Sequence, residues 1–253
     1  MSSTALTHWT VLGGRSLRLG RRNVEALVMS VALPVMLMIV FVYLFGGALR
    51  VGTDYVTYVV PGVMLLCVSF GSAMTAVSVA NDLTGGIVDR LRSLDVSGAA
   101  LLSGHVTASL ARNVLSSALV LGVALAIGFR PRADPGQWLA AAGILVLVIA
   151  AVSWLSAALG LLAGSAEAAG GYTFVITFLP YASSAFVPID TMPSWLRGFA
   201  GNQPVTPITE SLRGLLLDEP VGSAPWRAVA WCAGIVLVSV VAARVLFRAK
   251  TRG

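Results

Sequence analysis

The sequence predicts an all-α integral membrane protein with six transmembrane helices, on the strength of two observations. Of the 253 residues, 57% are hydrophobic and only 11% are charged, and the mean hydropathy is +0.87. A soluble domain carries roughly 25% charged residues, so this chain has too few to cover a globular surface. The charges are also unevenly placed. They leave six stretches without Asp, Glu, Lys or Arg: 26–46, 56–80, 113–129, 135–166, 168–189 and 228–243.

Each of these stretches is expected to hold one span, because a helix crosses a hydrocarbon core of about 30 Å with about 20 apolar residues. The fifth is marginal, since Pro180 and Pro188 interrupt it. The first contains Pro34, which should kink it. The predicted spans are 26–46, 56–80, 106–128, 137–164, 172–187 and 228–247.

Two segments on either side of the first pair of spans are amphipathic. In residues 4–24, Arg15, Arg18 and Arg22 recur at helical spacing, which predicts an interfacial helix lying on the membrane; an unstructured basic tail is the alternative. Residues 84–95 predict a short helix between the second and third spans, begun by Thr84 or a neighbouring glycine. Its apolar face would comprise Ile87, Leu91 and Leu94. An ordinary solvated loop explains the same pattern equally well.

The connection 188–226 is too apolar for a plain loop, and we expect a pair of short helices there. Pro193 is placed to begin the first, while Thr206 and Pro207 resemble the N-cap and first residue of the second. We expect these helices to dip into the leaflet or to lie on it. Non-helical backbone at membrane depth needs protein or a water-filled path beside it. A structural lid is the plainer alternative.

Basic residues set the predicted orientation, because cytoplasmic loops carry the excess of Lys and Arg. Both termini and the 81–105 connection hold more of them than the opposite side of the membrane. The first group comprises Arg15, Arg18, Arg21, Arg22, Arg90, Arg92, Arg112, Arg244, Arg248, Lys250 and Arg252. The second comprises Arg50, Arg130, Arg132, Arg197, Arg213 and Arg227. We therefore expect a multi-pass protein of the cell membrane with both termini in the cytoplasm.

The chain offers little chemistry of its own. A phosphate-binding loop needs a lysine after a glycine-rich turn, and the only lysine is Lys250, near the C-terminus. His8 and His105 lie in separate stretches and predict no metal site, and no cofactor is expected in this chain. Cys67 and Cys232 lie in apolar segments and are expected to be buried free thiols. The basic residues flank spans and form no stripe with aromatics, which argues against nucleic acid.

Two motifs resemble a known family. Residues 81–97 read N-D-L-T-G-G-I-V-D-R-L-R-S-L-D-V-S, which resembles the cytoplasmic signature of ABC-2 type permeases, closest to the daunorubicin-resistance branch. The external region from Ala185 to Arg213, with its Asn202-Gln203-Pro204-Val205-Thr206-Pro207 run, resembles the same branch. The likeness covers nearly the whole chain. One departure is Asp95, which stands where the pattern usually has proline and puts the exact geometry of the short helix in doubt.

The resemblance implies the membrane half of an ABC exporter of ABC-2 (type V) architecture. Two permeases, identical or paralogous, would pair with two copies of a separate ATPase subunit that binds ATP and Mg²⁺. The implied cargo is a hydrophobic drug, antibiotic or lipid-like molecule. The residues expected to contact the ATPase are Arg15, Arg18, Arg22, Thr84, Gly86, Ile87, Asp89, Arg90, Leu91, Arg92 and Leu94.

A transport path is expected along the second and fifth spans, because they adjoin the two unusual connections. The candidate lining residues are Ser69, Thr75, Thr177, Tyr181, Ser183 and Phe186, each of which could instead serve helix packing. Arg112 and Glu167 are the ionisable residues nearest membrane depth; Arg112 is expected to extend back to the cytoplasmic interface. Two other functions remain open: an ion-coupled secondary transporter, and a membrane assembly protein that transports nothing.

Overall fold

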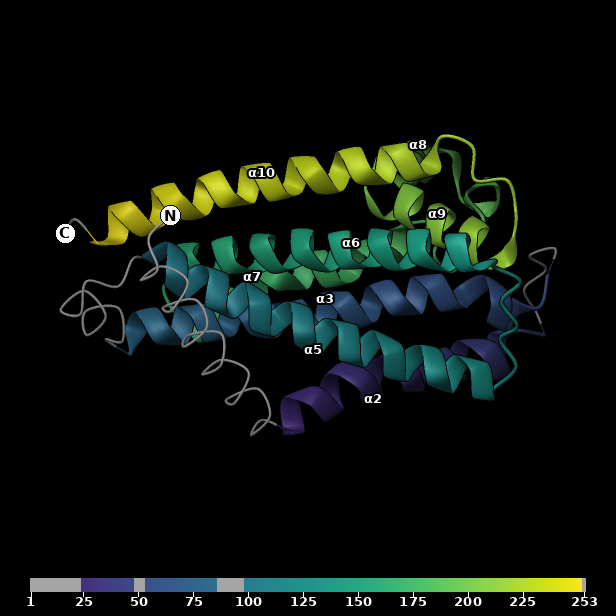
Figure 1. The fold of residues 1–253 in the computed structure, drawn as a ribbon, viewed down its shortest axis with the longest axis horizontal. Helices are drawn as coiled ribbons and strands as arrows, with labels where there is room; N and C mark the ends of the chain where they lie inside the picture. The colour runs from purple at the N-terminus through teal and green to yellow at the C-terminus, as the bar shows by residue number, and fades with distance from the viewer. Residues whose placement is uncertain (1–23, 48–52, 86–97, 252–253) are drawn as a thin grey trace.

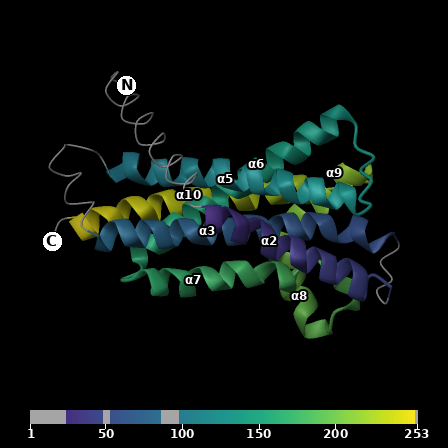
Figure 2. The same cartoon turned by 90° about the horizontal axis from the view of Figure 1, so that it is seen from below.

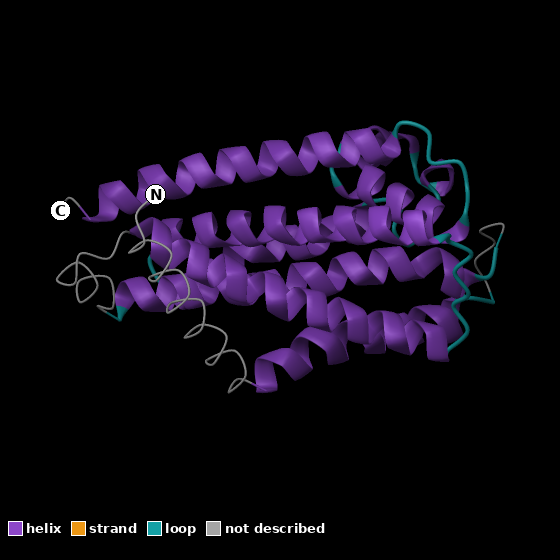
Figure 3. Cartoon of the chain, in the orientation of Figure 1, coloured by secondary structure: helices purple, strands orange, loops and turns teal. Residues whose placement is uncertain are grey.

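The computed structural model describes residues 24–47, 53–85 and 98–251, and in these ranges the regular structure is helical throughout. The long helices run side by side along the longest axis of the molecule (Figures 1 and 3). They are α2 (Val24–Val40), which continues as the π-helix η1 (Phe41–Phe45), α3 (Tyr55–Thr84), α5 (Gly98–Ala126), α6 (Pro135–Leu162), α7 (Ala166–Phe178) and α10 (Ala224–Thr251). The short elements are η2 (Leu179–Ala182), η3 (Ile189–Thr191), α8 (Ser194–Asn202) and α9 (Val205–Leu217).

Four of the described helices are long and apolar enough to cross a membrane. These are Tyr55–Thr84, Leu101–Ala126, Pro135–Leu162 and Ala224–Lys250, and Val31–Phe45 is a shorter apolar helix. They match the multi-pass membrane protein that the composition predicts, while the count of six spans stays a prediction.

The fifth predicted span, 172–187, differs most from the structure. Its α-helix begins six residues earlier, at Ala166, where the Ser165 hydroxyl accepts a hydrogen bond from the Ala168 N–H at 3.2 Å. It ends at Phe178, because Pro180 lacks an N–H and the chain tightens into the 3₁₀ turn η2. At 13 residues, α7 is about 20 Å long and falls short of the hydrocarbon thickness.

The fourth helix also begins two residues before its predicted start at 137. Helix α6 begins at Pro135 with a capping box: the Asp134 carboxylate accepts from the Gln137 N–H, and the Gln137 side chain accepts from the Asp134 N–H, both at 2.8 Å. Proline at the first helical position costs nothing, since that N–H would be unpaired anyway.

Helix α3 is the centre of the bundle. It contacts α2, α5, α6, α7 and α9, and 72% of its 18-residue apolar stretch is buried. Helix α10 contacts α6 and α9 along one side, and only 17% of its 18-residue apolar stretch is buried. Figure 2 shows α7 and α8 on one side of α3, with α5 and α6 on the other. An apolar face as exposed as that of α10 needs lipid or another protein as its surroundings.

The two ends of the bundle differ. At one end, here called the Thr84 end, α3 and α10 terminate and α6 turns into α7; the Lys250 ammonium donates to the Ala163 carbonyl there at 3.1 Å. At the other, the α9 end, lie α8, α9 and the connection 127–134 (Figure 1). The Arg132 N–H donates to the Leu216 carbonyl at 2.9 Å, which ties that connection to α9.

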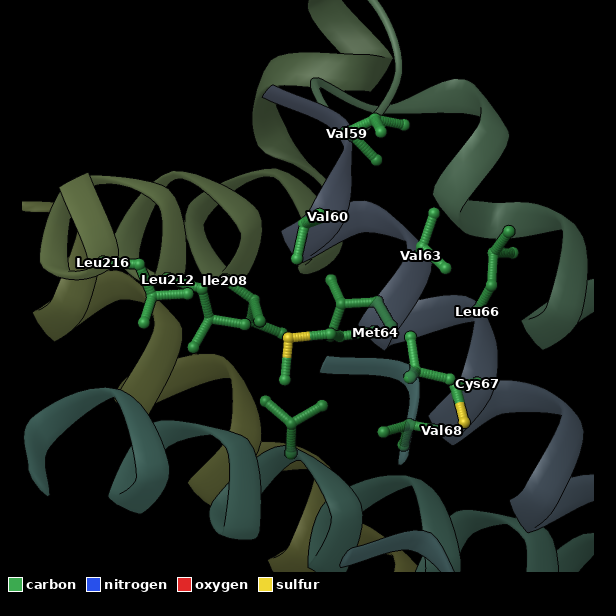
Figure 4. Close-up of a cluster of buried hydrophobic side chains, with 14 of the residues drawn as sticks. Val59, Val60, Val63, Met64, Leu66, Cys67, Val68, Ile208, Leu212 and Leu216 are labelled. Atoms are coloured by element: carbon green, nitrogen blue, oxygen red, sulfur yellow. The ribbon is translucent and has the colours of Figure 1, made fainter. Parts of the chain in front are cut away.

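Helix α9 is packed into the bundle, whereas α8 lies on its surface. Ile208, Leu212 and Leu216 of α9 pack against the part of α3 that carries Val60 and Met64 (Figure 4). In α8, Trp195 and Phe199 are 78% and 52% exposed. The predicted start of α9 at Thr206 and Pro207 is wrong by two residues, because the helix begins at Val205.

Candidate functional site

The residues expected to contact an ATPase fall almost entirely outside the described ranges. Arg15, Arg18, Arg22, Gly86, Ile87, Asp89, Arg90, Leu91, Arg92 and Leu94 all lie there. Thr84 is described, and it ends α3 rather than beginning a separate helix. Its hydroxyl donates to the Ala80 carbonyl one turn back, at 3.0 Å. Helix α3 therefore extends four residues beyond the predicted end of the second span at 80, and the 86–97 connection follows it.

A histidine–aspartate pair joins the two helices that flank this connection. His105 Nε2 on α5 lies 2.9 Å from Asp82 Oδ2 on α3, and both side chains are largely buried, at 15% and 20% exposed. This contact links α3 and α5 at the Thr84 end.

Three of the six candidate path residues are buried and hydrogen-bonded to nearby backbone groups. Ser69 and Thr177 are buried, and their hydroxyls donate to carbonyls one turn back in their own helices, at 2.9 and 3.1 Å. Ser183 is fully buried in the loop before η3; its hydroxyl accepts from the Ala185 N–H and donates to the Pro180 carbonyl. The hydroxyls of these three residues have hydrogen-bond partners nearby in the chain. The place of the three residues on a transport path stays a prediction.

Tyr181 and Phe186, by contrast, belong to a continuous series of aromatic rings at the α9 end. Successive ring centroids lie 4.2–5.6 Å apart along the order Phe45, Phe41, Phe186, Tyr181, Phe178, Phe174. We call this the aromatic series. Both ends of it are exposed: Phe45 is 44% exposed, Phe178 50% and Phe174 60%. Its first two rings sit on the π-helix η1, an element that occurs mostly as short insertions at functional sites.

A half-buried arginine, Arg213, holds the α9 end together. The Arg213 guanidinium lies 3.6 Å above the centre of the Tyr58 ring, and donates to the carbonyls of Tyr58 at 3.2 Å and Ser184 at 2.9 Å. The Tyr58 hydroxyl donates to the same Ser184 carbonyl at 2.9 Å, and the Tyr55 hydroxyl to the Phe186 carbonyl at 3.0 Å. Arg213 thus binds α9, α3 and the 183–186 segment into one unit. Its cation–π and charged hydrogen bonds are strong in such a desolvated place.

Thr206 adds a second link to the same segment. Its hydroxyl donates to the Ala200 carbonyl at 2.6 Å and accepts from the Ser184 N–H at 3.2 Å. The sequence motif around 202–207 therefore bridges α8, α9 and the 183–186 segment, instead of simply capping a helix.

A shallow pocket of about 370 Å³ opens beside Arg213, and charged groups of both signs line it. Arg227 Nη2 lies 3.5 Å from Glu210 Oε2, and Glu219 also lines the pocket. Burial raises the pKa of the Glu210 carboxyl, and the charges of Arg227 and Arg213 lower it in part. A balanced, open pocket of this kind favours no single class of ligand.

The feature that sequence reasoning missed is a buried polar layer between α3, α5 and α6. Ser109 Oγ lies 2.8 Å from Ser153 Oγ, and Asn113 Nδ2 donates to Ser109 Oγ at 3.1 Å and to Ser72 Oγ at 3.3 Å. The signal was present in the i, i+4 spacing of Ser109 and Asn113 on α5. Arg112 borders this layer, and its Nη2 donates to the Gly71 carbonyl at 2.8 Å and to Thr75 Oγ1 at 3.0 Å. The guanidinium turns onto α3, and its expected extension toward the interface stays a prediction.

Comparison with known proteins places these features in context. The model of the ABC-2 type transporter family matches residues 7–217, which include the 86–97 connection and all of α9. A daunorubicin resistance ABC transporter permease protein of Streptomyces coeruleorubidus is 32% identical over 190 residues. The alignment covers 74% of this chain and 66% of that protein, slightly less than two thirds of it.

A more distant relative is aligned over a longer part of both chains. A probable doxorubicin resistance ABC transporter permease protein of Mycobacterium tuberculosis, found alike in strains CDC 1551 / Oshkosh and ATCC 25618 / H37Rv, is 27% identical over 232 residues. That alignment covers 90% of this chain and 83% of the relative.

Proposed function

Because the chain belongs to the ABC-2 type transporter family, we propose that it is the membrane-spanning permease subunit of an ABC exporter powered by a separate ATPase subunit. The family match over 7–217 carries this proposal, since it spans both motifs that the sequence singles out. The relatives are themselves named as permease proteins of drug-resistance ABC transporters.

The energy source is proposed to lie in a partner. The only lysine of the chain, Lys250, donates to a backbone carbonyl at the Thr84 end, and no glycine-rich turn precedes it. We propose two ATPase subunits, which bind ATP and Mg²⁺, and a second permease that is identical or paralogous. The connection from Thr84 to Leu94 and the segment around Arg15–Arg22 would contact the ATPase on the cytoplasmic side.

The architecture supports this arrangement. The end of α3, the end of α10 and the α6–α7 turn lie together at the Thr84 end (Figure 1), which the distribution of basic residues predicts to be cytoplasmic. The His105–Asp82 pair braces the two helices through which movement of the 86–97 connection would reach the membrane. Closure of the ATPase dimer would push on this connection and shift α3 and α5 together.

One double charge reversal tests the proposal. In a complex of this permease with its partner ATPase, Asp89→Arg combined with Arg90→Asp should abolish permease-dependent ATPase stimulation and drug export. The reason is that the substitution inverts the local charge pattern at the proposed contact. Both activities are measured in reconstituted vesicles.

The matched control is Arg132→Asp, which inverts an exposed charge at the opposite end of the bundle and should leave both activities intact. Unchanged export in the double variant would contradict ATPase contact at 84–95. Export driven by a pH gradient without an ATPase would instead identify a secondary carrier. A protein that neither binds an ATPase nor moves a drug would be an assembly factor.

The aromatic series is the proposed contact for a hydrophobic, aromatic cargo. Stacked aromatic pairs contribute about 0.5–1.5 kcal/mol beyond area burial, so the loss of two rings should weaken contact with a planar drug roughly five- to tenfold or more. We expect Phe174→Ala with Phe178→Ala to reduce daunorubicin export by about that factor. Both rings are at least half exposed, so the thermal unfolding midpoint should change little.

Phe199→Ala is the control for this prediction. Phe199 is 52% exposed on α8 and lies outside the aromatic series, so its removal should leave export unchanged. Equal losses in the two variants would show a general effect of exposed aromatic surface and not a cargo contact.

A further inference from the structure

Arg112 is a positive charge within a membrane helix that lacks a negative partner among the described residues. Its two hydrogen bonds go to neutral acceptors, the Gly71 carbonyl and the Thr75 hydroxyl, and both come from Nη2. Its Nε is buried without a hydrogen-bond partner. Asp82, an acidic residue farther along α3, is already paired with His105.

This arrangement leaves a charge incompletely compensated. An arginine within a membrane helix is costly, and such residues usually pair with another charge. Two neutral dipoles offset part of that cost, but they leave the charge itself unbalanced. An anion that contacted the remaining N–H groups would complete the pairing, and a guanidinium binds phosphate oxygens with a geometry suited to two hydrogen bonds.

The guanidinium also lies where a ligand could reach it from the lipid. On α5, Asn113 and Ser116 mark the fully buried side, whereas Leu115 and Leu119 are 50% and 44% exposed. At 100° per residue, Arg112 falls on the border between these two faces. A ligand could approach it along the α3–α5 seam without opening the bundle.

Depth in the membrane selects the kind of ligand. Thr75 lies nine residues before the end of α3 at Thr84, about 13 Å along the helix axis. With α3, about 45 Å long, taken as centred on a hydrocarbon core of about 30 Å, Thr75 lies about 6 Å inside the boundary at this end. The phosphate of a lipid head group lies just beyond that level.

We propose that Arg112 is the binding site for the head-group phosphate of an anionic lipid in the leaflet at the Thr84 end. The lipid contacts the outward side of the guanidinium, because its Nε is buried and its Nη2 stays bound to Gly71 and Thr75. The site is independent of ATPase coupling, so it can be tested on the permease alone.

Lipid binding is measured by native mass spectrometry of the purified permease titrated with palmitoyl-oleoyl phosphatidylglycerol, with the matching phosphatidylcholine for comparison. Arg112→Gln should weaken the tightest phosphatidylglycerol site about tenfold or more, because it removes a charge-assisted phosphate contact. Arg112→Lys should keep most of the affinity, since it retains the positive charge. Thr75→Val should keep it too, because it removes a structural acceptor and leaves the charge.

Arg244→Gln is the control for unspecific attraction, since Arg244 is an exposed arginine on α10 and its loss should leave this site unchanged. Wild-type affinity in Arg112→Gln, or an equal loss in Arg244→Gln, would overturn the proposal. So would equal losses of binding and unfolding temperature in Thr75→Val and Arg112→Gln, which would show a purely structural link between α3 and α5. Displacement of the lipid by inorganic phosphate would place the source of the anion in water and overturn the lipid assignment.

A wild-type measurement covers the case in which Arg112→Gln does not fold. Phosphatidylglycerol with a photoreactive group beside its phosphate should label peptides of α3 and α5 near Gly71, Thr75 and Arg112. Labelling confined to α10 or to the α9 end would refute the site.

Discussion

Gly160→Leu should prevent α6 from packing on α3, so that little of the protein in the membrane is folded. A Cβ atom at Gly160 would lie 2.5 Å from the Ala76 carbonyl oxygen and 3.0 Å from the Ala76 Cα. Both are backbone atoms in the middle of α3, which the surrounding helices hold on nearly every side. Overpacking a core costs typically about 1–3 kcal/mol, and a clash with backbone cannot be relieved by turning a side chain. The two helices would have to separate.

The chain provides both the control and the readout for this experiment. Gly143 lies in the same helix with nothing within 4 Å of an added Cβ, so Gly143→Leu should be tolerated. Cys67 and Cys232 are buried and form no disulfide, so a thiol-reactive fluorescent dye reports their exposure as the protein unfolds. Gly160→Leu should yield protein whose thiols react at once, whereas Gly143→Leu should unfold near the wild-type temperature. A normal transition in Gly160→Leu would show that α3 and α6 do not approach as closely as described.

Arg213→Met should loosen the α9 end and lower the thermal unfolding midpoint by about 5 °C or more. The substitution keeps a long side chain but removes hydrogen bonds to two carbonyls and the stacking on Tyr58. Hydrogen bonds from a charged group contribute about 1.5–3 kcal/mol each. For a chain of this length, 1 kcal/mol corresponds to roughly 2–4 °C. Drug export should fall as well, because Ser184 and Phe186 belong to the same fixed segment as the aromatic series.

Arg227→Met is the matched control for Arg213→Met. Arg227 pairs with Glu210 at 3.5 Å, but its side chain is 51% exposed, and an exposed ion pair contributes at most about 1 kcal/mol. The same thiol-reactivity assay should therefore detect a clear shift for Arg213 and little for Arg227. Arg213→Lys should fall between wild type and Arg213→Met, because lysine keeps the charge without the planar set of donors. Equal midpoints for Arg213→Met and Arg227→Met would show that Arg213 does not organise this end.

The aromatic series and the Arg213 unit show why a functional region escapes sequence reasoning. Phe41 and Phe186 are far apart in the chain, yet their ring centroids lie 4.8 Å apart. Tyr58 and Arg213 are 155 residues apart. Tyr181 and Phe186 were predicted as path residues from their position in the fifth span. Phe41, Phe174 and Phe178 carried no sign of belonging with them, because each reads as an ordinary apolar residue of a membrane helix.

Helix ends show a local version of the same problem. The capping box at Asp134 and Gln137 is a short-range pattern that the sequence contains in full, and it marks the start of α6 at Pro135. At Thr206, the local pattern itself misleads. Threonine before proline is typical of an N-cap, but its hydroxyl is engaged by Ala200 and Ser184, which only the folded chain brings near.

The sequence by itself determined the class of the protein and its family. So few charges, set between long apolar stretches, require a lipid environment, and the motif at 81–97 carries the family likeness; both are properties of residue type and spacing along the chain. Only the tertiary structure decided which helix lies at the centre, which rings stack, and where the charges of Arg112 and Arg213 go. An apolar helix has no polar face to mark its inner side, so its neighbours are settled by packing and by hydrogen bonds between distant residues.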